Sequence, residues 1–69
     1  VNNMNHQAAI EEILNTKTRE AIIDHINGYG DSIDWSDYTT RQILEEVSRS
    51  DIEAGEGNEG ILANLYHEL

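Results

Sequence analysis

Histidine is the side chain with the widest chemical use in this sequence, because it can ligate a metal ion or transfer a proton near neutral pH. The chain carries His6, His25 and His67. A metal site or a catalytic pair would need a second ligand at fixed spacing, as in the HExxH and ExxH motifs. Neither motif occurs, and no two histidines have ligand spacing. We therefore predict three exposed, solvated histidines and no zinc or di-iron site.

Calcium is the other metal that so acidic a chain could bind. A twelve-residue loop that begins at Asp34 ends at Glu45, as in an EF-hand, but its sixth position is Thr39, where a glycine is required. A loop that begins at Asp51 ends at Leu62, which cannot ligate. The sequence therefore predicts no specific metal site.

Acid–base catalysis would require buried carboxylates with shifted pKa values. The adjacent pairs of glutamates lie beside the apolar positions rather than on them, at Glu11, Glu12, Glu45 and Glu46. A chain of 69 residues also has little room for a substrate pocket. We therefore expect a protein that is not an enzyme and that needs no cofactor.

Charge is the strongest compositional feature of the chain. Fourteen acidic residues face four basic ones, for a net charge of −10. The excess is concentrated in residues 31–69, where ten acids and two bases give a net charge of −8. Direct nucleic-acid binding needs clustered Lys and Arg, and an anionic membrane would repel this surface. A basic protein surface, in contrast, would attract it.

The elements that position these side chains are predicted to be helices. Apolar residues recur at helical spacing, and proline, which would interrupt a helix, is absent. The apolar stripes are Ile10, Ile13 and Leu14; Ile22, Ile23 and Ile26; Thr40, Ile43, Leu44 and Val47; and Ile61, Leu62, Leu65, Tyr66 and Leu69. We predict an all-α fold, a small compact single domain of three to four short helices over residues 1–69, with residues 1–5 disordered.

Capping residues indicate where these helices begin and end. Thr16 or Thr18 can cap the second segment, although a break before it is not certain from the sequence, and Asn27-Gly28 ends it. Residues 28–37 are rich in turn formers and are predicted to form a connector loop. The third helix is then expected to begin at Ser36 or Asp37. Residues 50–53 fit a capping box for a further turn, and Asn58 is the expected cap of the last helix.

A short motif in the connector has a chemical meaning of its own. Gly30-Asp31-Ser32-Ile33 resembles the modified-serine motif of acyl and peptidyl carrier proteins, which are also small, acidic and built from four helices. The resemblance implies a serine at the start of a helix, with 4'-phosphopantetheine attached to Ser32. It also implies that partner enzymes recognise Asp31 and Asp34. In the alternative interpretation, Asp31 and Ser32 form an ordinary turn.

The favoured functional interpretation is a small protein-binding module, an inhibitor or regulator that occupies the basic nucleic-acid-binding surface of a partner. In size and charge the chain is similar to DNA-mimic inhibitors of phages, including anti-restriction and anti-CRISPR proteins. The residues expected to form its acidic surface are Asp31, Asp34, Asp37, Glu45, Glu46, Asp51, Glu53, Glu56 and Glu59. The alternatives are the carrier-like protein and a structural or self-associating helical subunit.

Aromatic residues near the connector offer a second mode of partner binding. Tyr29, Trp35 and Tyr38 are of the types that dominate interface hot spots. Because the chain has no Phe, however, we favour Trp35 as the main aromatic of the core. Homo-oligomerisation through the last apolar stripe is a further alternative. The absence of cysteine and of a bilayer-length apolar run fits a cytoplasmic protein.

Overall fold

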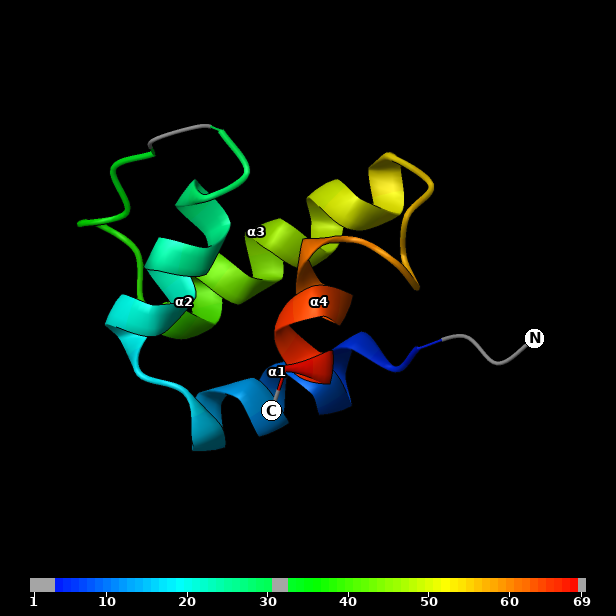
Figure 1. Ribbon diagram of the computed structural model, residues 1–69, viewed down its shortest axis with the longest axis horizontal. Coiled ribbons are helices and arrows are strands. Elements are labelled where there is room, and N and C mark those ends of the chain that lie inside the picture. Colours follow the sequence, from blue (N-terminus) through cyan, green and yellow to red (C-terminus); the bar gives the residue numbers. More distant parts are fainter. Residues whose placement is uncertain (1–3, 31–32, 69) are drawn as a thin grey trace.

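The computed structural model describes residues 4–30 and 33–68. It contains α1 (His6–Thr16), α2 (Arg19–Asn27), α3 (Thr40–Glu53) and α4 (Ile61–His67), as Figure 1 shows. No strand occurs within these two ranges. The prediction of a small all-α domain of three to four short helices is therefore confirmed.

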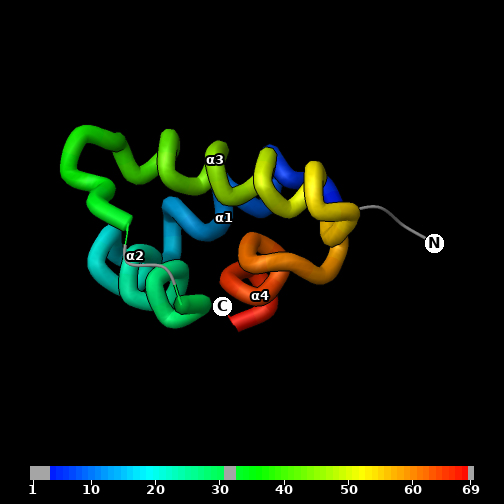
Figure 2. Tube along the Cα trace, turned by 90° about the horizontal axis from the view of Figure 1, so that it is seen from above, coloured from blue at the N-terminus to red at the C-terminus, as the bar shows by residue number. Residues whose placement is uncertain are grey.

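The shortest helix is at the centre of the packing. α4 contacts α1, α2 and α3, and α1 also packs against α3. Figure 2 shows α1 and α3 running together along one side of the molecule, with α2 and α4 below them. Leu62 and Leu65 of α4 have no exposed area, so these two residues of the last apolar stripe are used inside the domain and are not available to a second copy.

The core is built mainly from the predicted stripes. Its buried members are Ala9, Ile10, Ile13, Ile22, Ile26, Trp35, Ile43, Leu44, Val47, Leu62 and Leu65. Trp35 reaches this cluster from the connector and is 8% exposed. The interpretation of Trp35 as a core residue is therefore confirmed.

The first two helices have the caps that the sequence allows. The Asn5 side chain accepts the backbone N–H of Ala8, and the Thr18 side chain accepts that of Ala21. The Met4 backbone N–H donates to Asn58 Oδ1 over 2.7 Å. The expectation of disorder over residues 1–5 is therefore wrong for Met4 and Asn5, because both make specific contacts, while residues 1–3 lie outside the described ranges.

The third helix begins later than predicted. Its cap is Thr39, which forms a full capping box with Gln42, so neither Ser36 nor Asp37 begins the helix. The reason is a turn before it, in which Asp34 Oδ1 accepts the N–H of Ser36. The connector consequently runs over residues 28–39.

The end of α3 and the start of α4 also differ from the prediction. α3 continues through Glu53, so residues 50–53 end a helix rather than begin one. The chain then turns at Gly55, whose φ of +75° favours glycine over residues with a Cβ. The N-cap of α4 is Gly60, which has no side chain to cap the helix. Asn58 is therefore not the cap that was expected.

Candidate acidic interface

Asp51 is buried rather than part of the surface. It is 4% exposed, and its two carboxylate oxygens accept the backbone N–H groups of Ile61 at 3.2 Å and Leu62 at 2.9 Å. Asp51 of α3 thus caps the start of α4, because Gly60, the N-cap residue, has no side chain that could do so. Its negative charge also interacts favourably with the positive N-terminal end of the α4 dipole. The prediction that Asp51 contributes to the partner-binding surface is therefore wrong. The spacing of residues within α3 could not reveal it, because Asp51 caps a different helix.

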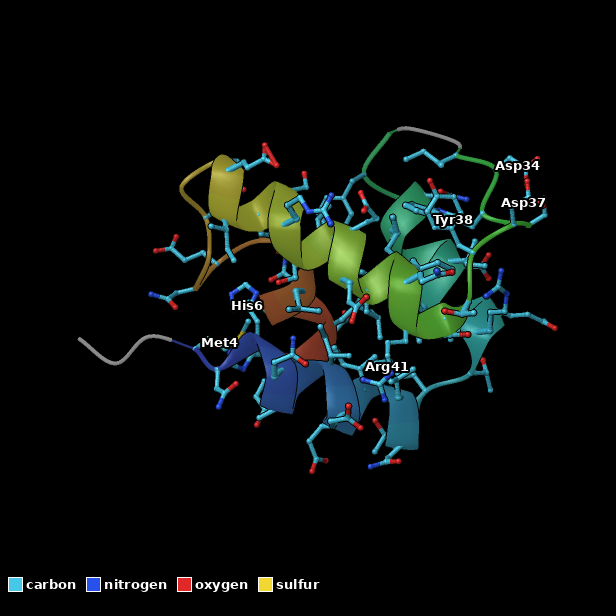
Figure 3. The ribbon with its side chains drawn as sticks, turned by 180° about the vertical axis from the view of Figure 1, so that it is seen from behind. Met4, His6, Asp34, Asp37, Tyr38 and Arg41 are labelled. Carbon is cyan, nitrogen blue, oxygen red and sulfur yellow. The ribbon has the colours of Figure 1, made fainter. Side chains whose placement is uncertain are left out.

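The remaining predicted acids lie along α3 and in the two segments that flank it. Those described as exposed are Asp34, Asp37, Glu45, Glu53, Glu56 and Glu59, and Glu46 is half-buried. Figure 3 shows Asp34 and Asp37 in the connector that leads into α3. Asp31 lies outside the described residues. We call these seven described carboxylates the acidic surface.

The three arginines are already held by contacts within the fold. Arg19 donates to the carbonyl of Trp35 over 2.8 Å. Arg41 of α3 pairs with Glu11 of α1, and Arg49 pairs with Glu46 at 3.1 Å. Within the described ranges, no Lys, Arg or His lies within ion-pair distance of the carboxylates of Asp34, Asp37, Glu45, Glu53, Glu56 and Glu59.

The arginines also divide the acidic surface. Arg41 and Arg49 both lie on the exposed side of α3, next to Glu45 and Glu46. The carboxylates without a cation are therefore densest at the two ends of α3. One group is Asp34 and Asp37 in the connector, and the other is Glu53, Glu56 and Glu59, at the end of the helix and beyond it.

The Glu11–Arg41 pair makes stability depend on pH in a defined direction. The hydrogen bond from Arg41 holds the pKa of Glu11 below its usual value of 4.5. The pair therefore stabilises the fold above that value, and this contribution is lost as the pH falls through the lowered pKa. We expect Glu11→Gln to be less stable than Glu12→Gln at about pH 7, and we expect this difference to diminish as the pH falls below 4.5. Urea unfolding of both variants measures this, and an unchanged difference at low pH would contradict it.

The aromatic side chains of the connector differ in role. Tyr38 is 40% exposed and packs edge-on against the Trp35 ring, with centroids 5.1 Å apart. Tyr29 is 52% exposed, and its hydroxyl accepts a hydrogen bond from Asn64 Nδ2 at 2.7 Å. Tyr29 and Trp35 both line a pocket of about 260 Å³ between the connector, α2, α3 and the start of α4. The two tyrosines are therefore accessible to a partner, whereas Trp35 is a wall of the pocket.

Two of the histidines are not the free side chains that the sequence predicted. His6 Nε2 donates to the carbonyl of Gly57 at 2.7 Å, and its Nδ1 bonds Ser48 Oγ at 2.6 Å. His25 lies 3.0 Å from the Glu68 carboxylate. Only His67 is exposed, so the prediction is wrong for the other two. The contacts of His6 span more than forty residues of chain, which no local motif encodes.

The His6 contacts connect the start of α1 to α3 and to the loop before α4. Figure 3 shows His6 at the start of α1. Replacing His6 with alanine leaves Gly57 O and the buried Ser48 hydroxyl without this partner. We expect His6→Ala to lower the free energy of unfolding by about 1–3 kcal/mol. The matched control is His67→Ala, which is expected to change it by less than about 0.5 kcal/mol. Equal effects in urea unfolding would contradict the bridging role.

Neither the metal nor the carrier interpretation gains support. Among the described residues, no group of three or more potential ligands is arranged to hold a metal ion. Ser32 lies outside the described residues, and α3 begins at Thr40, eight positions later, rather than at the serine as the carrier resemblance implies. No described helix is long and apolar enough to cross a membrane.

Comparison with known proteins adds no assignment. No family model, curated protein or solved structure matches the chain.

Proposed function

We propose that this domain acts by binding rather than by catalysis, as an inhibitor or regulator that occupies a basic, nucleic-acid-binding surface of a partner protein. One observation carries the proposal. The three arginines are engaged within the fold, while the acidic surface keeps exposed carboxylates at both ends of α3. The acidic excess therefore lies mainly on the surface, and Asp51 is the one buried acid among the described residues.

The dimensions of the acidic surface are compatible with such a partner. α3 has 14 residues and is therefore about 20 Å long, so nearly four helical turns separate the two flanking groups of carboxylates. Duplex DNA carries about one charge per 1.7 Å of axis, a higher density than this surface has. The domain is consequently better suited to cover a few Lys and Arg contacts than to imitate a long duplex.

The experiment is a capture of partners by the tagged domain from lysate of its source cells, with matched charge variants. Two variants neutralise the acidic surface, Asp34→Asn/Asp37→Asn and Glu53→Gln/Glu56→Gln/Glu59→Gln. The control, Glu12→Gln/Glu20→Gln/Asp24→Asn, removes the same charge as the second variant from α1 and α2. We expect the wild type and the control to retain one nucleic-acid-binding protein, and at least one surface variant to lose it.

Competition distinguishes a shared site from mere attraction. Duplex DNA is expected to displace the domain from the captured protein, because both would occupy the same basic surface. Simultaneous binding of DNA and the domain would contradict occupation of that surface. Equal loss of the partner by the control and the surface variants would show that net charge alone is responsible, and capture of no basic protein would overturn the proposal.

A further inference from the structure

The pocket beside the connector has a lining of two chemical kinds. Six lining residues are apolar or aromatic: Ile26, Tyr29, Ile33, Trp35, Val47 and Ile61. Glu46 and Ser50, from one side of α3, are the polar members. Tyr29 and Ile33 are about half exposed, at 52% and 46%, so the domain leaves apolar area at this pocket open to solvent. This apolar area is available to a side chain of a partner.

The shape and charge of the pocket select among occupants. A volume of about 260 Å³ holds one long side chain and is small for most free ligands. Apolar walls with a single carboxylate match an aliphatic stem that ends in a cation. A guanidinium also packs well on aromatic faces and can bond a carboxylate through two N–H groups. These properties favour arginine.

The carboxylate that would receive the cation, that of Glu46, can exchange its present partner for another. Glu46 pairs with Arg49 at 3.1 Å, one helical turn along α3, and the Arg49 side chain is 66% exposed. Such an exposed pair contributes little, so an incoming guanidinium can replace it. Trp35, in the pocket lining, has a buried Nε1 with no acceptor among the described residues.

We propose that this pocket binds one arginine side chain of the basic partner segment, with its stem against Ile26, Val47 and Ile61 and its guanidinium on Glu46. The inference rests on the proposed function, since it names the residue of the basic surface that the domain would recognise. It assigns specificity to the pocket, whereas the acidic surface supplies long-range attraction.

The test uses a capped Gly-Ser-Arg-Ser-Gly peptide and its citrulline analogue, which has nearly the same shape without the charge. Binding is followed by backbone amide shifts and by the fluorescence of Trp35, the only tryptophan. We expect saturable shifts at pocket residues for the arginine peptide and none for the citrulline peptide. Glu46→Gln is expected to weaken binding about tenfold, and Glu45→Gln, the adjacent residue outside this pocket, less than about twofold.

A second variant removes the space and keeps the charge. Ser50 is exposed and lines the pocket, so Ser50→Leu is expected to fill it, to leave the fold intact and to abolish the pocket shifts. Shifts spread over all acidic residues, equal effects of Glu45→Gln and Glu46→Gln, or absence of shifts would each overturn the pocket assignment. The capture experiment decides the proposed function separately, because its charge variants change Asp34, Asp37, Glu53, Glu56 and Glu59, none of which lines this pocket.

Discussion

Replacing Asp51 with alanine is expected to lower the free energy of unfolding by about 2–4 kcal/mol. The carboxylate is buried and accepts the N–H groups of Ile61 and Leu62, which have no partner inside α4. Without the carboxylate, the N–H groups of Ile61 and Leu62 either stay buried without an acceptor or reach water only if the first turn of α4 unwinds. A domain of this size has about 3–10 kcal/mol in total, so the loss is a large fraction. Urea unfolding followed by Trp35 fluorescence measures it.

Two further variants show whether the cap is responsible. Asp51→Asn keeps one acceptor oxygen and is expected to have an intermediate stability, which also provides a measurable variant where the alanine protein does not fold. Glu53→Gln removes the same charge from an exposed position of α3 and is expected to change stability by less than about 0.5 kcal/mol. An Asp51→Ala variant as stable as Glu53→Gln would contradict the capping role.

Gly60→Ala is expected to be about as costly, at about 2–4 kcal/mol, for a steric reason. A Cβ at this position would lie 2.3 Å from Cγ of Asp51, closer than carbon atoms can approach. The backbone of Gly60, at φ −83°, would itself accept alanine. The added methyl group must therefore displace the Asp51 carboxylate and with it the cap of α4. Urea unfolding of the single variant gives the size of the effect.

A double-mutant cycle connects these two expectations. In the Asp51→Ala background the added Cβ has no carboxylate to displace, so Gly60→Ala should cost much less there. Gly57→Ala is the control, because its Cβ would make only ordinary contacts at 3.7 Å or more. Additive effects of the Asp51 and Gly60 substitutions would show that the clash is not the cause.

The sequence predicted the part of the fold that depends on local pattern. Apolar spacing identified the stripes that form the core, and Thr18 and Asn27-Gly28 bound α2 as expected. The start of α3 was misplaced because Ser36 and Asp37 resemble caps as well as Thr39 does, whereas the structure places Ser36 in a turn closed by Asp34 before the helix. Local propensity cannot resolve such a choice.

The contacts that sequence reasoning missed are those between distant segments. From the sequence, Asp51 was predicted to be part of the acidic surface and His6 to be exposed and solvated. Both are held by partners in the last third of the chain. The net charge, in contrast, could be predicted from composition. The arrangement of the charges could not, because Arg41 and Arg49 divide the acidic surface on α3. The pocket at Glu46 likewise depends on the fold, which brings α2, the connector, α3 and α4 together.

The central claim is that the acidic surface binds a basic protein surface. It is tested most directly by the dissociation constant for the captured partner as a function of salt. Between about 50 mM and about 500 mM NaCl we expect the affinity to fall by at least tenfold, because salt screens exposed charges. The Glu53→Gln/Glu56→Gln/Glu59→Gln variant should show a shallower dependence than the α1–α2 control. An affinity that is unchanged over this range would contradict the claim and would indicate recognition through apolar contacts instead.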